Sequence, residues 1–365
     1  MTHGFDEGDF RDRPSRRGSR PRTKQRPDHA DAERGRVTGV DRGRFAVLMS
    51  EGDPEERWIT AMKARELGRG RIVVGDRVDV VGDTSGDDGT LARIVRIAER
   101  TTVLRRTADD TDPYERVVVA NADQLAIVTA LADPEPRTRM IDRCVVAAYD
   151  AGMDALLVLT KADLADPDDL VGLYEPLGVR IAVTQQDGDR IVGIEGLHED
   201  LAGRVTVLVG HSGVGKSTLV NALVPTADRA TGGVNVVTGR GRHTSTSAVA
   251  LRMPSGHGAG EGWVIDTPGV RSFGLAHVTQ ETLLAAFGDL ADVAAQCPRG
   301  CTHLAGAPDC VLDEWVAQAQ GERDERDGAG GEPGAGDDGA EHARRAARVD
   351  SFRRLLAART DTVSP

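Results

Sequence analysis

Nine consecutive residues carry the clearest chemical pattern in the chain, the spacing G-x-x-x-x-G-K-[ST] of a phosphate-binding loop. An apolar run, VTVLV, precedes the pattern, and a helix-like run, STLVNAL, continues from its end. Glycines here let backbone N–H groups point at phosphate oxygens, while Lys216 reaches the β- and γ-phosphates and the Ser217 hydroxyl reaches Mg²⁺. The sequence therefore predicts a nucleoside triphosphate site with Mg²⁺, formed by Gly210, His211 (through its backbone), Ser212, Gly213, Val214, Gly215, Lys216, Ser217 and Thr218.

A second motif, Asp266-Thr267-Pro268-Gly269, follows the short strand-like run WVI. An aspartate at the end of a neighbouring strand can hold the magnesium ion through water, and the backbone N–H of Gly269 can contact the γ-phosphate. By itself the motif could be an ordinary turn. Its place after a phosphate loop favours a magnesium and γ-phosphate role for Asp266 and Gly269.

A third motif, Thr160-Lys161-Ala162-Asp163, follows the apolar run ALLVL. It resembles the guanine-specific pattern N-K-x-D, with Thr160 in the place of asparagine. The aspartate of that pattern accepts hydrogen bonds from guanine N1–H and the exocyclic amine, and adenine offers no donor there. The alternative is a helix start with Asp163 as its cap. The preceding strand favours a guanine-binding role for Thr160, Lys161, Ala162 and Asp163, with Thr184-Gln185 in the usual place of a base-contacting pair.

Three of the four cysteines lie within fourteen residues, with a histidine among them. Three thiolates and one imidazole match a closed, tetrahedral, structural zinc site, which supports folding rather than catalysis. The alternative is a group of buried cysteines beside a surface histidine. We predict one Zn²⁺ per chain, held by Cys297, Cys301, His303 and Cys310, and expect Cys144 to be a core residue of an apolar helix.

The order of the nucleotide motifs is unusual, because the guanine motif precedes the phosphate loop, which precedes D-T-P-G. Most GTPases have the phosphate loop first and the guanine motif last. The order indicates a circular permutation, which a fold tolerates when its original termini lie close together on the surface. The segment after Asp266 then runs directly into the C-terminal region, so nucleotide state could move that region.

The elements that position these motifs divide the chain into four parts. Residues 1–33 are polar and arginine-rich, and we expect a disordered basic tail. Residues 34–105 show five short strand patterns separated by turn residues, which favour a small OB-type β-barrel. Residues 106–275 alternate apolar strands with helices, as in a parallel sheet. Residues 276–365 read as helical, interrupted by a flexible, glycine- and acid-rich loop at about 321–342.

Composition limits the possible classes of protein. The 365 residues carry a net charge of −12, which argues against nonspecific nucleic-acid binding by the whole surface, although a local basic patch remains possible. No apolar run approaches the roughly 20 residues of a membrane-spanning helix. The N-terminal residues have no apolar core and cannot be a secretory signal. We therefore expect a cytoplasmic protein without membrane contact.

The motifs, their permuted order and the flanking regions together resemble the RsgA family of circularly permuted ribosome-assembly GTPases, over about residues 34–365. The resemblance implies an OB domain, a permuted GTPase domain and a zinc domain. It also implies GTP hydrolysis, stimulated by the small ribosomal subunit during late maturation of that subunit. The partners would be GTP and GDP, the small subunit and its ribosomal RNA, and we expect a monomer.

The residue that orients the attacking water is less evident. Ras-like enzymes place a glutamine directly after D-x-x-G, where this chain has Val270, which cannot orient water. The stretch GRGRHTST resembles the family's first switch loop, and its His243 is the best substitute, because a neutral imidazole can order a water. His243 could instead pack or contact RNA. Thr244 or Thr246 would complete the magnesium shell.

Two other functions fit parts of the sequence. The first is a zinc-containing RNA-binding module whose nucleotide site is inactive or only a slow GTP switch. Intact Lys216, Ser217 and Asp266 argue against an inactive site, whereas Val270 is compatible with a slow one. The second is an ATPase or a small-molecule kinase with the same phosphate loop. Replacement of Asp163 by asparagine should relax guanine preference in a GTPase and have no effect in an ATPase.

Overall fold

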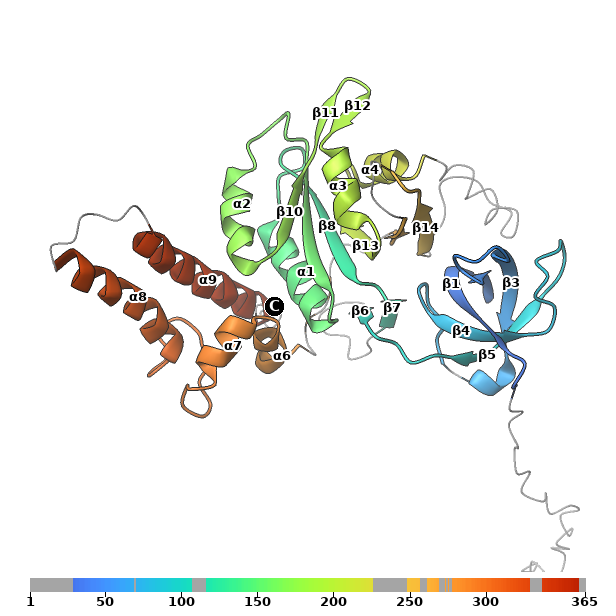
Figure 1. Ribbon diagram of the computed structural model, residues 1–365, viewed down its shortest axis with the longest axis horizontal. Helices are drawn as coiled ribbons and strands as arrows, with labels where there is room; N and C mark the ends of the chain where they lie inside the picture. The colour runs from blue at the N-terminus through green and yellow to red at the C-terminus, as the bar shows by residue number, and fades with distance from the viewer. Residues whose placement is uncertain are drawn as a thin grey trace, which may run out of the picture.

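The computed structural model (Figure 1) describes residues 29–68, 70–106, 116–225, 248–256, 261–268, 273, 275, 278–328 and 337–360, without the side chains of 320–328, 337–340 and 359–360. A small barrel lies at one end of the molecule, helices of the C-terminal region lie at the other, and a sheet with flanking helices stands between them. None of the helices in these ranges has the length and apolar character that crossing a membrane requires.

The barrel forms because five strands alternate apolar residues that point inward with polar residues that point outward. Its interior takes one valine or isoleucine from each strand, all nearly inaccessible: Val37, Val47, Ile59, Val78 and Ile94. The pairing runs β1–β2–β3–β5–β4 and back to β1, so these strands close on themselves. The strands are β1 (Glu33–Asp41), β2 (Arg44–Met49), β3 (Arg57–Lys63), β4 (Arg77–Val81) and β5 (Ala92–Ile97), with the short helix η1 (Arg65–Leu67) after β3.

The central sheet has the order β10-β9-β8-β13-β15-β14, parallel except for β14. Every residue of β8 is buried, as expected for a strand covered on both faces. The strands are β8 (Gln124–Ala130), β9 (Asp154–Thr160), β10 (Arg180–Val183), β13 (Val205–Gly210), β14 (Val249–Met253) and β15 (Gly262–Asp266).

Alternate residues of β8 belong to two different hydrophobic cores. Leu125 and Ile127 pack on the side of α1, while Ala126 and Val128 pack on the side of α3 and α4. The remaining elements of this region are the helices α1 (Thr138–Asp150), α2 (Asp168–Tyr174), η2 (Glu175–Leu177), α3 (Ile194–Leu201) and α4 (Lys216–Leu223), and the hairpins β6 (Val103–Arg106) with β7 (Arg116–Ala120) and β11 (Gln185–Asp187) with β12 (Arg190–Val192).

The C-terminal region contains α6 (Gln280–Ala285), α7 (Gly288–Ala294), α8 (Val311–Gly328) and α9 (Asp337–Thr360). Thr279 caps α6, since its hydroxyl accepts the Thr282 N–H in a capping box. The segment predicted as a flexible loop at 321–342 is instead helical at both ends, because α8 extends to Gly328 and α9 begins at Asp337. Glutamate and arginine between Glu322 and Arg326 are good helix formers, and they outweigh the single glycine at Gly321.

Aromatic contacts attach these C-terminal helices to the central region. The Phe287 ring, just before α7, meets the Tyr149 ring of α1 edge-on at 5.3 Å between centroids. It meets the Phe352 ring of α9 at 5.5 Å in the same manner. Phe287 and Phe352 are fully buried, so the helices share one core with α1.

The barrel is attached to the sheet at β14. Gly39 of β1 pairs with Val249 of β14, which in turn pairs with Asp266 of β15. Arg252 of β14 donates two hydrogen bonds, of 2.8 and 2.6 Å, to the carboxylate of Glu56, in the loop before β3. Trp263 of β15 donates a 2.8 Å hydrogen bond from its indole N–H to the Glu51 carboxylate of the barrel. We call Glu51, Glu56, Arg252 and Trp263 the barrel joint.

Candidate functional site

The predicted phosphate loop joins the end of β13 to the start of α4. Gly213 and Gly215 have φ values of 84° and 87°, in the left-handed region that favours glycine. At Gly210 a Cβ atom would come within 2.5 Å of the Val128 carbonyl oxygen of the neighbouring strand. Val214 is buried against the core on the α4 side, while Ser212, Ser217 and Thr218 are exposed. Glycines therefore allow the tight turn and the close approach of the backbone that phosphate binding needs.

Lys216 and Asp266 meet at the carboxyl ends of two adjacent parallel strands. The Lys216 ammonium group donates a hydrogen bond to the Asp266 carboxylate. Leu208 of β13 is in register with Asp266 of β15, and the buried Thr267 hydroxyl donates a 2.8 Å hydrogen bond to the Leu208 carbonyl. The lysine and the aspartate thus lie together beside the phosphate loop, as binding of a triphosphate and Mg²⁺ requires. Gly269 lies outside the described residues.

The predicted guanine motif begins at the end of β9 and reaches the phosphate loop. The Thr160 hydroxyl is buried and donates a 2.7 Å hydrogen bond to the Val214 carbonyl. Its methyl and hydroxyl lie just under 4 Å from where a Cβ of Gly215 would be. Thr160 therefore connects the end of β9 to the phosphate loop. The motif alone does not reveal this hydrogen bond, because Val214 lies 54 residues away in the sequence.

The rest of this motif is held by loops on either side. Lys161 has a left-handed φ of 59° and donates a hydrogen bond to the Asp133 carbonyl. The Ala162 N–H donates to the buried Thr184 carbonyl oxygen at 3.2 Å. One oxygen of the exposed Asp163 carboxylate accepts the Gln186 N–H at 3.1 Å, which orients the carboxylate. Asp163 thus remains accessible to a base. Its neighbour Gln186 was not predicted from the sequence.

Two further positions complete the nucleotide region. His211, in the phosphate loop, has its Nε2 atom 3.3 Å from a terminal nitrogen of Arg137, just before α1. Because arginine can only donate, this contact uses the ring nitrogen as an acceptor. His243, Thr244 and Thr246 lie outside the described residues, so their predicted roles are untested.

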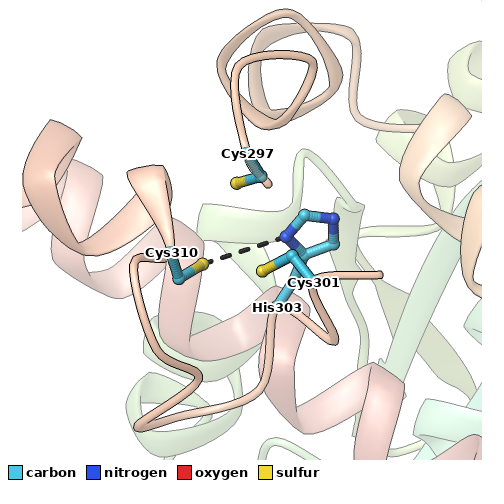
Figure 2. A group of neighbouring side chains, drawn as sticks. All are labelled: Cys297, Cys301, His303 and Cys310. Carbon is cyan, nitrogen blue, oxygen red and sulfur yellow. Dashed lines mark hydrogen bonds between the residues drawn. The ribbon is translucent and has the colours of Figure 1, made fainter. Parts of the chain in front are cut away.

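The four predicted zinc ligands converge (Figure 2). The ligand atoms of Cys297, Cys301, His303 and Cys310 all lie within 4.8 Å of one another. Cys310 Sγ lies 3.8 Å from His303 Nδ1. A tetrahedral zinc ion with ordinary bond lengths would place these two atoms about 3.6 Å apart. The cluster therefore fits Zn²⁺ in both its donor set and its dimensions.

Hydrogen bonds from neighbouring elements support the cluster. The backbone N–H of Val311, the first residue of α8, donates to Cys297 Sγ at 3.3 Å. The Gln280 side-chain amide of α6 donates to the Cys301 carbonyl at 2.9 Å. Burial, together with the nearby positive charge of Arg353, lowers the pKa of His303, which favours the neutral, coordinating imidazole. Burial raises the pKa of the Cys310 thiol to about 11, so zinc binding would displace its proton.

The cluster uses all four tetrahedral positions for protein atoms, which is typical of a structural metal site. The fourth cysteine, Cys144, lies elsewhere, on α1, where its side chain is buried in the core as predicted. Zinc at the cluster would supply folding energy by holding together the segment from Cys297 to Cys310, between α7 and α8.

Comparison with known proteins gives the family. A family model described as RsgA GTPase matches residues 97–276. The "Small ribosomal subunit biogenesis GTPase RsgA" of Alcanivorax borkumensis is 34% identical over 331 residues, which cover 87% of this chain and 88% of that protein. The protein of the same name from Ectopseudomonas mendocina is 40% identical over 249 residues, or 66% of this chain and 68% of that protein.

Two solved structures share the fold. YjeQ from Thermotoga maritima matches with a TM-score of 0.59 and 28% identity, over 89% of this chain and 99% of its own. YloQ, described as a circularly permuted GTPase, matches with a TM-score of 0.59 and 21% identity, over 93% of this chain and 99% of its own. Together with the closed barrel and the Cys–His cluster of this chain, they confirm the predicted fold class, an OB-type barrel, a permuted GTPase domain and a C-terminal helical region with a zinc-compatible cluster. On the extent and identity of the curated relatives, this chain belongs to the RsgA family of GTPases.

Proposed function

We propose that this protein hydrolyses GTP during assembly of the small ribosomal subunit, and that the subunit itself stimulates hydrolysis. The observation that carries the proposal is the meeting of three motifs at one edge of the sheet. Thr160 of the guanine motif contacts the phosphate loop, and Lys216 of that loop contacts Asp266. The relatives over most of the chain are named as small-subunit biogenesis GTPases.

Each residue has a defined task in this proposal. Asp163 recognises guanine, and Lys161 connects this motif to the loop before α1 through its bond to the Asp133 carbonyl. Lys216 neutralises the β- and γ-phosphates, and the backbone of the loop from Gly210 to Gly215 donates to their oxygens. Ser217, Thr244 or Thr246, and Asp266 surround Mg²⁺, which offsets the charge that develops on the phosphates.

We propose His243 as the residue that orients the attacking water, because Val270 cannot do so. Ribosomal RNA would be contacted by the barrel, the zinc region and the arginine-rich tail at residues 1–33, whose cations suit phosphates. The protein would act as a monomer in the cytoplasm, where ribosomal subunits are assembled.

The test is phosphate release from GTP and from ATP, each measured with and without purified small ribosomal subunits. We expect strong stimulation by small subunits with GTP only, and no stimulation by large subunits as a control. Equal rates with and without small subunits would overturn the ribosomal part of the proposal. A preference for ATP would overturn the role of Asp163 and favour a P-loop ATPase.

The alternative, an RNA-binding zinc module with a slow GTP switch, predicts GTP binding and subunit binding without accelerated turnover. His243→Ala separates the two functions. The proposed role predicts that this variant still binds GTP and the subunit but loses most of the stimulated rate. A slow switch predicts that the substitution leaves turnover unchanged.

A further inference from the structure

Arg353 of α9 lies against the metal-ligand cluster but is not one of its four ligands. Its Nε donates a 3.0 Å hydrogen bond to the backbone carbonyl of His303. One terminal nitrogen lies 3.9 Å from Cys310 Sγ, within the range for a hydrogen bond to sulfur. The other donates a 2.8 Å hydrogen bond to the carboxylate of Asp313, in the first turn of α8. All three nitrogens thus contact the segment between His303 and Asp313, which contains two of the four ligands.

The charge of the zinc-loaded cluster explains why a cation belongs there. Three thiolates and a neutral imidazole around Zn²⁺ carry a net charge of −1. Cys297 and Cys301 are partly exposed, but Cys310 is 3% exposed and His303 is 6% exposed, so water can screen the charge on the Cys310 sulfur only weakly. The Arg353 side chain is itself only 12% exposed. A buried guanidinium beside a buried thiolate offsets its charge and donates a hydrogen bond to its sulfur.

We propose that Arg353 is a positioning residue of the zinc site, which holds His303 and Cys310 in their coordinating arrangement and donates a hydrogen bond to the Cys310 thiolate. Arginine suits this task because its planar fork has three nitrogens with fixed directions, whereas lysine has one. The proposal depends on zinc occupying the cluster and is independent of ribosome binding and GTP hydrolysis.

The next residue of the helix supplies a matched control. Arg354 points away from the cluster, toward the central region, where it donates to the Asp142 carboxylate of α1 at 3.2 Å and to the Leu173 carbonyl of α2 at 3.1 Å. Loss of Arg354 removes a similar guanidinium from the same helix and weakens its attachment. Only loss of Arg353 removes a contact to the metal ligands.

The first measurement is the rate at which the full-length, zinc-loaded protein releases zinc to a chromophoric chelator. We expect Arg353→Met to release zinc roughly 10- to 100-fold faster than wild type, because loss of an outer partner of metal ligands weakens metal affinity by about this factor. Arg354→Met should stay within about twofold of wild type. An unchanged rate in Arg353→Met, or equal acceleration in both variants, would overturn the proposal.

The second measurement tests the hydrogen bond to sulfur. Cobalt(II) replaces zinc in such sites, and its thiolate-to-metal charge-transfer band reports electron density on sulfur. Arg353→Met should move this band to lower energy because the sulfur loses a donor, whereas Arg354→Met should leave it in place. An unmoved band in Arg353→Met would refute the bond to Cys310. If Arg353→Met does not fold, the same two measurements are made on Arg353→Lys. Faster zinc release and a shifted band are again expected, because one ammonium group cannot replace the three nitrogens of the guanidinium.

Discussion

Thr160 stands where the base-recognition motif meets the phosphate loop. In the usual guanine pattern an asparagine occupies this position, and an amide offers more hydrogen bonds than a hydroxyl. Here the Thr160 hydroxyl donates its hydrogen bond to the Val214 carbonyl, and the Thr160 side chain lies next to Gly215. The substitution therefore preserves the connection between the two motifs.

The first prediction concerns this connection. Thr160→Val keeps the shape of the side chain but leaves the buried Val214 carbonyl without its partner, so GTP affinity should fall about tenfold. Affinity can be measured by titration with a fluorescent GTP analogue. Thr206→Val is the control, because it removes a buried hydroxyl bonded to Gln124 in the same sheet, away from the phosphate loop. Equal losses of affinity in both variants would show that only general stability has changed.

The second prediction concerns base selection. Asp163→Asn replaces an acceptor of two guanine hydrogen bonds, and we expect GTP affinity to fall by roughly 100-fold while affinity for xanthosine triphosphate rises. Competition titrations with GTP, xanthosine triphosphate and ATP measure the change. The exposed Asp187, in the adjacent hairpin, gives the control Asp187→Asn, which should retain guanine preference. Retained preference in Asp163→Asn as well would refute the assignment of the base site.

At this scale the sequence could predict residue types but not their partners. The phosphate loop was predictable because it requires left-handed backbone conformations that glycine adopts readily. The structure shows this conformation at Gly213 and Gly215. The bonds of Thr160 to Val214 and of Arg353 to His303 join residues 54 and 50 positions apart. Neither pair lies within a single motif, so only the fold reveals it.

Among the elements, the β14–β15 pair connects the barrel to Asp266, at the carboxyl end of β15. Trp263 is flanked by two guanidinium groups, with Arg36 at 5.5 Å and Arg252 at 5.2 Å from its ring centroid. Glu51 accepts hydrogen bonds from Arg36 and Arg77 as well as from Trp263. The barrel joint is therefore a network of partly buried charges around one aromatic ring, which orients β14 as well as the barrel.

The third prediction tests the contribution of this joint. Glu56→Gln removes the charge that holds Arg252, so β14 should open more readily, and its amides should exchange with solvent roughly fivefold faster, equivalent to about 1 kcal/mol. Hydrogen exchange of peptides covering β14 measures the change. Glu33→Gln is the control, because Glu33 pairs with Arg57 and Thr84 within the barrel alone. Unchanged β14 exchange in Glu56→Gln would show that the ion pair adds nothing to the joint.

The fourth prediction is the pH dependence of the same pair. Hydrogen bonds from Arg252 hold the pKa of the Glu56 carboxyl below its usual value of 4.5. A carboxyl whose pKa is lowered by folding adds stability above its unfolded pKa, and this stability is lost as the pH falls through its folded pKa. The exchange difference between wild type and Glu56→Gln, measured at equal pH, should be full above roughly pH 5.5 and shrink below roughly pH 4.5. A difference that grows on acidification would contradict this.

The periodicity of apolar residues predicted whether a segment is a helix or a strand better than it predicted where that helix or strand ends. The five barrel strands were predictable because each alternates inward and outward residues, as at Val37, Val47 and Ile59. The extension of α8 to Gly328 was missed, because glycine and acidic residues were interpreted as a flexible loop. Charged residues such as glutamate and arginine are neutral to favourable in helices, so composition alone could not locate the helix end.

Across the whole molecule, the zinc-compatible cluster secures one end of the fold. Its ligands precede α8, and α9 carries both Arg353, which contacts the cluster, and Phe352, which packs in the core with Phe287. Loss of the metal would free the loop before α8 and loosen this packing. The sheet and its nucleotide motifs lie on other elements, so they should remain folded.

The fifth prediction follows from this arrangement. Cys310→Ser should purify with little zinc and show a lower thermal unfolding midpoint, whereas its GTP affinity should stay within a few-fold of wild type. Cys144→Ala is the matched cysteine control, because Cys144 is buried away from the cluster. It should retain about one zinc ion per chain, as measured by metal analysis. Zinc loss in Cys144→Ala, or full zinc content in Cys310→Ser, would refute the assigned ligands.

The barrel joint also has a consequence for the timing of synthesis. Glu56 and Arg252 are 196 residues apart in the chain, and Glu51 and Trp263 are 212 apart. The barrel is complete at Ile97, 155 residues before Arg252, so at about 5–20 residues per second it waits roughly 8 to 31 seconds for that partner to be synthesised. During that interval Glu51 keeps its barrel partners Arg36 and Arg77 but lacks Trp263, and Glu56 lacks Arg252. The barrel joint therefore cannot form until β14 and β15 have been synthesised, well after the last strand of the barrel.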